Sequence, residues 1–359
     1  MEKHPPRNLG LDMVRVTEAA ALAAGRWMVR GDRISADKAA SEAMFAALNT
    51  LDMDGRIVIG EENRVGISSS LDSGQRVGTG YGPTVDVVVD PVDGTALLTE
   101  GRSGAISVVG VAPAGSMWAP DAAAYMEKIV VDRQAADGLT PECLDAPAAW
   151  TLALIARLKQ KPVRDMVVFV LDRPRHQELI EEIRAAGARV WLRADGDISG
   201  AILAATPNSG ADVLMGVGGV AEGVVSACAI KAMEGAMLGR LAPQSAAENT
   251  ALLAAGQHST QILRVDQLVA SDEIFFAATG VTNGPLLRGV RYYGDHAETH
   301  SIILRTETGT RREITTEHSM KRLFAAINSK GQRTNDNANS LQRQNPRQTT
   351  GYRRCAERP

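Results

Sequence analysis

The sequence lacks the features typical of a secreted, membrane or zinc protein. Its three cysteines are odd in number and widely spaced, so they form neither a disulfide framework nor a CxxC metal site. The six histidines show no spacing suited to zinc. No apolar run approaches the ~18–20 residues of a membrane span, and the polar start shows no secretory signal. The net charge of −3 indicates no nucleic-acid or membrane partner. We expect a cytoplasmic protein.

The composition is otherwise that of a globular protein. Hydrophobic residues make up 44% and charged residues 23% of the 359 positions. A chain of this length can bury a large core in one large or two medium domains. The stretch from Gly331 to Pro359 differs, because it is polar, basic and nearly free of aliphatic residues. Such a composition cannot support a core, so we predict that residues 331–359 form a disordered tail.

The most informative stretch reads TVDVVVDPVDGT and ends at Thr95. Its apolar run, Val85–Val89, predicts a buried strand that ends at Asp90, because the proline that follows removes a donor. Asp90 and Asp93 at the mouth of a sheet can hold a hard cation such as Mg²⁺ or Mn²⁺. The N–H groups of Gly94 and Thr95 could face a phosphate. The alternative is a strand end with an ordinary Asx-type turn.

The apolar periodicity divides the chain into two differently organised parts. The first part predicts helices at residues 11–30, 35–51 and 148–158, and strands at 56–59, 85–89, 105–111 and 127–131. The second part alternates strands at 166–171, 188–192 and 211–216 with helices at 176–186, 198–205 and 222–235. A helix at 246–255, a strand at 273–279 and a hairpin of 300–305 with 311–316 complete the prediction. The alternation indicates βαβ units and a largely parallel sheet, with ligands at the carboxyl ends of its strands.

Three loops at such strand ends carry groups suited to a sugar phosphate. Arg173-Pro174-Arg175 offers two guanidinium groups for a phosphate. Asp195-Gly196-Asp197 could accept sugar hydroxyls or merely cap a helix, and Gly218-Gly219 with Glu222 could place a carboxylate beside a metal. The loop Gly216–Ala221 also matches a G-x-G-x-x-A nucleotide motif. We do not expect a dinucleotide site, because no strand ending in an acid follows at the required distance.

Together these motifs resemble the signature of the lithium-sensitive, metal-dependent sugar and inositol phosphatases, and within them the class II fructose-1,6-bisphosphatases of the actinobacterial branch. The resemblance implies a layered αβαβα fold with a metal-binding α+β half at 8–160 and an α/β substrate half with a mostly parallel sheet at 161–330. It implies hydrolysis of the 1-phosphate of fructose 1,6-bisphosphate to fructose 6-phosphate, a gluconeogenic step. The matching segments are VTEAA at 16–20, IVIGE at 57–61, YMEK at 125–128, DRPRH at 172–176, DGD at 195–197 and AEGVV at 221–225.

The resemblance also implies the roles of individual residues. We expect a homo-oligomer, a dimer or tetramer, that uses two or three Mg²⁺ or Mn²⁺ ions. The implied metal ligands are Asp37, Glu61, Asp90, Asp93 and Glu222. The implied catalytic residues are Thr95, Glu61 and Asp93. The implied substrate-binding residues are Asp93, Gly94, Thr95, Tyr125, Arg173, Pro174, Arg175, Asp195, Gly196, Asp197 and Gly219.

Two departures from the family pattern leave alternatives open. The segment 63–70 has no carboxylate, so the family's nearby catalytic Asp has no counterpart. Arg33 stands where the family has a lysine, and an arginine cannot give up its proton in the same way. One alternative is a paralogue acting on another sugar, cyclitol or nucleoside phosphate. The other is a catalytically silent sugar-phosphate binder, although all five implied metal ligands are present.

Overall fold

The computed structural model describes residues 9–60, 69–120 and 125–322. These residues fall into a main compact unit and a small unit, the latter made of Tyr292–Ala297 and the chain from Glu317 on. All elements of the candidate site lie in the main unit. The predicted disordered tail lies outside the described residues.

The first sheet has the strand order β12-β13-β11-β4-β3-β1-β2, with β14 paired to β13. Helix α1 packs on β11, β4 and β3, and α7 packs on the opposite face of the same strands. The predicted C-terminal hairpin is confirmed. The strands are β1 (Asp54–Ile59), β2 (Arg76–Val77), β3 (Thr84–Asp93), β4 (Ile106–Pro113), β11 (Phe275–Gly280), β12 (Arg291–Tyr293), β13 (His296–Arg305) and β14 (Thr310–Ser319).

The second sheet has the strand order β10-β9-β5-β8-β6-β7. Its strands are β5 (Tyr125–Val131), β6 (Val167–Leu171), β7 (Arg189–Arg193), β8 (Val213–Gly219), β9 (Ala236–Leu241) and β10 (Leu263–Arg264). The helices of the main unit are α1 (Leu9–Gly25), α2 (Arg33–Leu48), α3 (Thr95–Glu100), α4 (Ala148–Leu158), α5 (Gln177–Ala185), α6 (Asp197–Ala205), α7 (Val220–Ala232), α8 (Ala246–Ala254) and α9 (Val265–Leu268).

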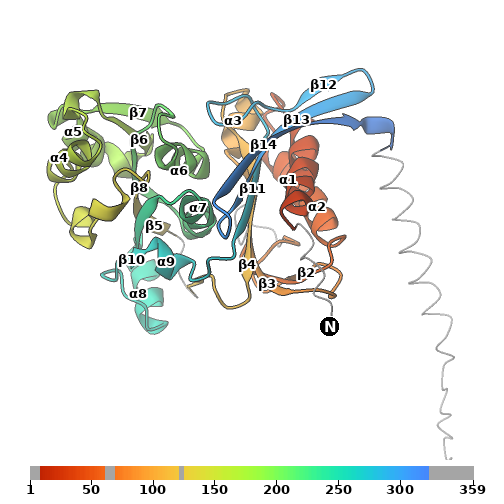
Figure 1. The fold of residues 1–359 in the computed structure, drawn as a ribbon, viewed down its shortest axis with the longest axis horizontal. Coiled ribbons are helices and arrows are strands. Elements are labelled where there is room, and N and C mark those ends of the chain that lie inside the picture. The colour runs from red at the N-terminus through yellow and green to blue at the C-terminus, as the bar shows by residue number, and fades with distance from the viewer. Residues whose placement is uncertain (1–8, 61–68, 121–124, 323–359) are drawn as a thin grey trace, which may run out of the picture. The chain divides into compact units, whose positions relative to one another are not determined.

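The two sheets sandwich α6 and α7, and this arrangement confirms the predicted layered α/β fold. One apolar core joins the inner faces of both sheets to α6 and α7, and a second core lies between the outer face of the second sheet and α4 and α5. Figure 1 shows α1 and α2, the first sheet, α7, the second sheet and then α4 and α5 in succession. Residues far apart in sequence can therefore meet at the ends of the strands.

The second sheet is parallel only over β7, β6 and β8, so the prediction of a mostly parallel sheet needs correction. These three strands come from the alternating segment and pair in parallel as predicted. Strand β5, which precedes that segment in the chain, inserts between β8 and β9 and is antiparallel to both. The alternation of strands and helices in this segment predicts that the strands within it run parallel. It does not predict which strand from elsewhere in the chain pairs with them.

Several helix and strand ends also differ from the predictions. Helix α1 ends at Gly25 instead of residue 30. Helix α2 begins at Arg33 instead of residue 35, and its N-cap is Asp32, whose carboxylate accepts a hydrogen bond from the Ser35 N–H at 3.0 Å. The predicted loop from Gly216 to Gly219 is instead the end of β8, paired with β5, which removes the context of a nucleotide-binding loop.

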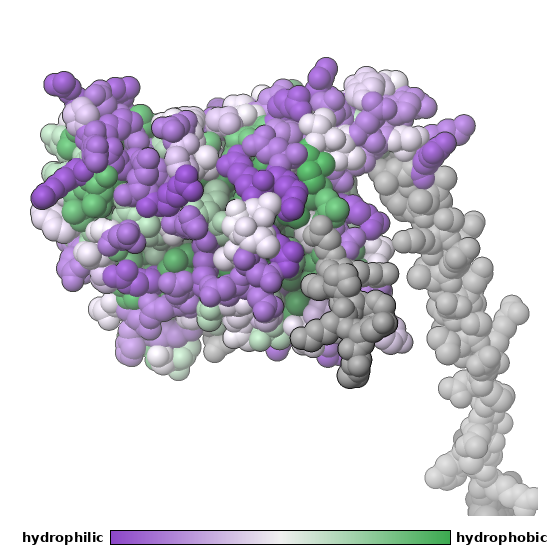
Figure 2. Space-filling view, in the orientation of Figure 1, coloured by the Kyte–Doolittle hydropathy of each residue, from purple (hydrophilic) through white to green (hydrophobic). Residues whose placement is uncertain are grey.

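The visible surface of the described residues is mainly hydrophilic (Figure 2). In Figure 2, hydrophilic residues cover most of the visible face of the described residues, and hydrophobic ones are scattered between them. Cys143 and Cys228 are buried free thiols. Among the described residues, no helix combines the length and apolarity needed to span a bilayer.

Candidate active site

A bulge in β3 brings Asp90 and Asp93 to the same side of the first sheet. Asp90 lies opposite Val108 of β4 and Asp93 opposite Ile106, so three steps along β3 match two steps along β4. In a regular strand, residues three apart point to opposite faces, and the extra residue removes that difference. The predicted strand end at Asp90 is thus wrong, since β3 continues to Asp93. Both aspartates are buried, at 2% and 0% exposure.

Glu222 joins these aspartates from the first turn of α7. Ligand oxygens of Asp90, Asp93 and Glu222 all lie within 4.8 Å of one another. The Gly219 N–H, at the end of β8, donates to Glu222 Oε2 at 2.6 Å and fixes this side chain where the helix begins. The direct passage from β8 into α7 therefore positions the third carboxylate of the cluster.

Asp93 is the most deeply buried member of the cluster. Its Oδ2 accepts a hydrogen bond from the Ser199 N–H at 3.0 Å, whereas its buried Oδ1 has no hydrogen-bond partner among the described residues. Burial raises the pKa of Asp93 well above its usual range, and the carboxylates of Asp90, Glu222 and Asp195 raise it further. Such an orphaned oxygen in a cluster of like charges matches a site for a hard cation.

The raised pKa of Asp93 predicts a pH-dependent effect of replacing it. In EDTA, Asp93→Asn should become more stabilising relative to the wild type as the pH rises above about 4, the ordinary pKa of an aspartic acid. An acid whose folded pKa is raised contributes stability that is complete below its unfolded pKa and is lost as the pH rises through the folded value. The stabilising effect of the substitution should therefore grow as the pH rises.

Denaturant unfolding of both proteins at several pH values measures this difference. The lowered pKa values of His176 and His300 have the opposite effect on stability, but these histidines titrate in both proteins and cancel in the comparison. If the difference in free energy of unfolding between the two proteins stayed constant across the pH range, the raised pKa of Asp93 would be contradicted.

Thr95 and Asp37 form a second group beside the bulge. Gly94, with φ of 92°, turns the chain from β3 into α3, and Thr95 is the first residue of that helix. The Thr95 hydroxyl lies 3.2 Å from both Asp37 Oδ1 and the Val92 carbonyl oxygen, two acceptors that share its single proton. Asp37 is buried on α2 and is connected to the site through Thr95, outside the three-carboxylate cluster.

The predicted phosphate-binding loop lies close to the cluster. Pro174 begins a short 3₁₀ turn, and Arg173 forms an ion pair with Asp195 at 3.3 Å. Arg175 donates to the Val217 carbonyl at 2.8 Å and lies 5.2 Å from the centre of the Tyr125 ring.

Tyr125 connects this loop to the metal-ligand candidates. In the sheet it lies directly opposite Gly219, whose N–H holds Glu222. The arginine loop is thus joined through neighbouring strands to the acid cluster.

The DGD segment is only partly available to a ligand. Gly196, with φ of 93°, is the N-cap of α6, so the segment does cap a helix. Asp197 is 3% exposed and forms an ion pair with Lys128. Burial raises the pKa of Asp197 to about 7, the Lys128 ammonium lowers it, and the nearby Glu222 carboxylate raises it.

Three residues of this region were missed by the sequence reasoning. Ser199 offers its N–H to Asp93, and Lys128 pairs with Asp197. His176 is buried, accepts a hydrogen bond from the Val217 N–H at 2.8 Å, and faces the Leu171 carbonyl across 2.7 Å through Nδ1. Burial lowers the pKa of His176. Lys128 and His176 lie in segments that carry the family resemblance, but their partners are distant in sequence.

The predicted metal ligand Glu61 lies outside the described residues.

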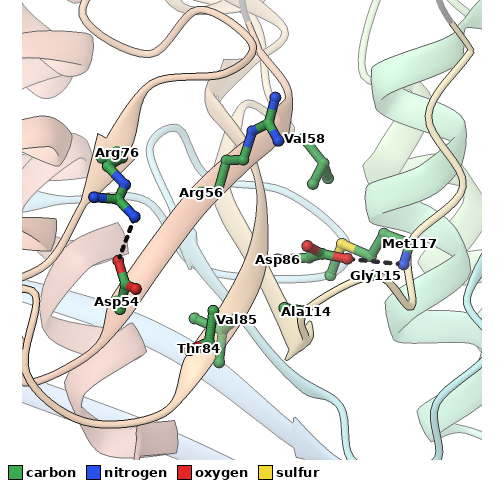
Figure 3. Close-up of a pocket in the computed structure, with 10 residues that line it drawn as sticks. All are labelled: Asp54, Arg56, Val58, Arg76, Thr84, Val85, Asp86, Ala114, Gly115 and Met117. Carbon is green, nitrogen blue, oxygen red and sulfur yellow. Dashed lines mark hydrogen bonds and ion pairs between the residues drawn. The ribbon is translucent and has the colours of Figure 1, made fainter.

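A cavity of about 390 Å³ lies at the beginning of β3, away from the carboxylate cluster. The cavity is lined by Arg56, Arg76 and Asp86, among others, and Asp86 accepts a hydrogen bond from the Met117 N–H (Figure 3). The Asp86 carboxylate also accepts a hydrogen bond from the Ser116 N–H. Asp86 lies seven residue steps along β3 from Asp93, a distance of roughly 20 Å. No predicted site residue lines the cavity.

Comparison with known proteins identifies the family. The model of a family described as bacterial fructose-1,6-bisphosphatase, glpX-encoded, matches residues 7–318. A class 2 fructose-1,6-bisphosphatase of Haemophilus influenzae is 39% identical over 336 residues, which cover 90% of this chain and 99% of that protein. Fructose-1,6-bisphosphatase 1 class 2 of Escherichia coli K12 is 38% identical over 330 residues, which cover 88% of this chain and 96% of that protein. The chain belongs to this family of bacterial fructose-1,6-bisphosphatases.

Proposed function

We propose that this protein hydrolyses the 1-phosphate of fructose 1,6-bisphosphate and releases fructose 6-phosphate. The observation that carries the proposal is the buried cluster of Asp90, Asp93 and Glu222 beside Thr95, in a chain that aligns with 99% of a class 2 fructose-1,6-bisphosphatase. Membership of the family makes the sugar bisphosphate the first substrate to test.

The chemistry of the cluster fits a divalent ion, and we propose that the complete site holds two or three. All its donors are oxygens, as Mg²⁺ and Mn²⁺ prefer, and the orphaned Asp93 Oδ1 is a buried acceptor that an ion would satisfy. We assign Asp90, Asp93 and Glu222 to a shared metal site, with Asp37 and Glu61 as further ligands. Bound ions would polarise the phosphoryl group and lower the pKa of water.

The residues around the cluster would bind and orient the reactants. In this proposal the Thr95 hydroxyl, held between Asp37 and the Val92 carbonyl, orients the attacking water. Backbone N–H groups near Gly94 would stabilise the negative charge that develops on the phosphoryl group.

The rest of the predicted set would hold the sugar bisphosphate. Arg173, Arg175 and Tyr125 would bind the phosphate that stays on the sugar. Sugar hydroxyls would lie against Asp195-Gly196-Asp197 and Gly219.

Phosphate release from a panel of esters tests the proposal. The panel contains fructose 1,6-bisphosphate, sedoheptulose 1,7-bisphosphate, an inositol phosphate and a nucleoside monophosphate, each with Mn²⁺ or Mg²⁺. The highest kcat/KM for the fructose ester, abolished by EDTA, is the expected result. Turnover without a divalent ion, or of none of these esters, would contradict it.

A second candidate is the hydrolysis of another small phosphate ester. It is favoured by the segment 63–70, which lacks the family's acidic residue, and by Arg33 in place of lysine. Arg33 forms an ion pair with Glu100 at 2.6 Å, so its guanidinium is directed to the end of α3. A preference for a different ester in the panel would support this candidate.

We also propose a cytoplasmic homo-oligomer, a dimer or tetramer. Light scattering of the purified protein measures the assembly directly, and a monomeric mass at working concentration would rule the oligomer out.

A further inference from the structure

Lys128 is a buried cation within an apolar layer. Among the lysines and arginines of the described residues it is the most deeply buried, with its side chain at 0% exposure. Met126 and Val130, two positions before and after it on β5, belong to the core around α6 and α7. Burying a charge is unfavourable unless it is paired, so the Lys128 ammonium requires the Asp197 carboxylate.

The backbone of the neighbouring strands packs closely against this ion pair and leaves no space for larger side chains at the glycine positions beside it. Gly216 of β8 and Gly239 of β9 lie directly opposite Lys128 in the two neighbouring strands. A Cβ atom on Gly218 would lie 1.8 Å from Asp197 Oδ2 and 2.7 Å from Lys128 Nζ. Glycine is thus required beside the pair, which is packed against the strand end leading to Glu222.

Lys128 also lies beside an excess of negative charge. Asp197 is close to Glu222, and Glu222 clusters with Asp90 and Asp93. Without a cation, the Asp197 carboxylate would be repelled by these neighbours. Lys128 binds Oδ2 of Asp197, so Oδ1 is the oxygen that this ion pair leaves unoccupied, and Asp197 also forms a side-chain hydrogen bond with Glu222.

We propose that Lys128 is a positioning residue, which fixes the Asp197 carboxylate so that Oδ1 can accept a hydroxyl of the sugar phosphate. This inference rests on the proposed function, because it takes Asp197 as a substrate contact. Lys128 itself would not contact the substrate. Its loss should weaken substrate binding and leave the metal site intact.

The test compares Lys128→Met, Asp197→Asn and the double variant K128M/D197N with the wild-type protein. For the ester that the wild type prefers, K128M should raise KM by about tenfold, the scale of one lost polar contact, with kcat and the Mn²⁺ activation constant within about twofold. The double variant should resemble D197N, because the two changes remove the same interaction. Non-additivity of this kind separates positioning from a general loss of stability.

Lys159→Met is the matched control. Lys159 is 6% exposed and pairs with Asp132 at 2.7 Å, beyond the far end of β5 from Tyr125. K159M should lower the melting temperature as K128M does and leave KM unchanged. An equal rise of KM in K159M, an unchanged KM in K128M, or a raised Mn²⁺ constant with unchanged KM would each overturn the inference.

Calorimetric titration of the Mn²⁺-loaded protein with fructose 6-phosphate separates this inference from the proposed function. If the wild type hydrolyses no ester, the proposed function fails. Wild-type binding of fructose 6-phosphate that is weakened about tenfold in K128M and retained in K159M would still support the positioning role. Equal binding by K128M and the wild type, or no wild-type binding, would overturn it.

Discussion

Asp93→Asn should lower kcat for phosphate release by about 10³-fold or more. Asp93 is the fully buried centre of the carboxylate cluster, and asparagine removes its charge with little change of shape. The same variant should lose most of the rise in melting temperature that Mn²⁺ gives the wild type, because an ion that binds only the folded state stabilises it. Phosphate release and thermal unfolding with Mn²⁺ or EDTA measure the two effects.

Asp86→Asn is the matched control for this substitution. Asp86 is also buried on β3, but its carboxylate accepts hydrogen bonds from the Ser116 and Met117 N–H groups, at the other end of the strand. D86N should cost about 1–2 kcal/mol of stability and keep the Mn²⁺ response and kcat. If D93N retained wild-type activity, Asp93 would have no place in the metal site.

Thr95→Ala should lower kcat by about 10²–10⁴-fold with a much smaller change in KM. The Thr95 hydroxyl is held between Asp37 and the Val92 carbonyl, the position from which the proposed water would be oriented. Thr95→Ser keeps the hydroxyl and should recover most of the activity. Steady-state kinetics of both variants provide the measurement.

Thr99→Ala controls for changes in α3 itself. The Thr99 hydroxyl, one turn further along the helix, donates only to backbone carbonyls, those of Thr95 and Ala96. T99A should keep kcat, and any loss should be in stability. Wild-type kcat in T95A, or an equal loss in T99A, would remove Thr95 from the proposed mechanism.

The elements of the site were largely predictable from local sequence. The apolar run before Asp90 is one that a buried strand shows, and the alternation after residue 163 indicated the parallel strands β7, β6 and β8. These predictions succeeded because hydrophobic periodicity acts over a few residues. The acids Asp93 and Glu222 were also singled out, through their place next to strand ends and through the family resemblance.

The contacts between distant segments could not be predicted in this way. The bulge in β3 depends on pairing with β4, and the strand end predicted at Asp90 was wrong for that reason. Lys128 was overlooked because a single lysine in a strand resembles an edge residue until Asp197, 69 positions away, is seen to pair with it. Ser199 was missed because it contributes a backbone N–H, which every residue but proline carries.

The sequence by itself determined the local structure of most segments, the acidic residue types at their ends and the family. Each of these depends on side chains that are near one another in the chain or on a pattern of motifs. Only the tertiary structure decided that β5 inserts between β8 and β9, that Glu222 meets Asp90 and Asp93, and that Asp197 faces a buried lysine. The physical reason is that strand pairing and helix packing depend on surfaces contributed by distant segments, which local periodicity does not encode.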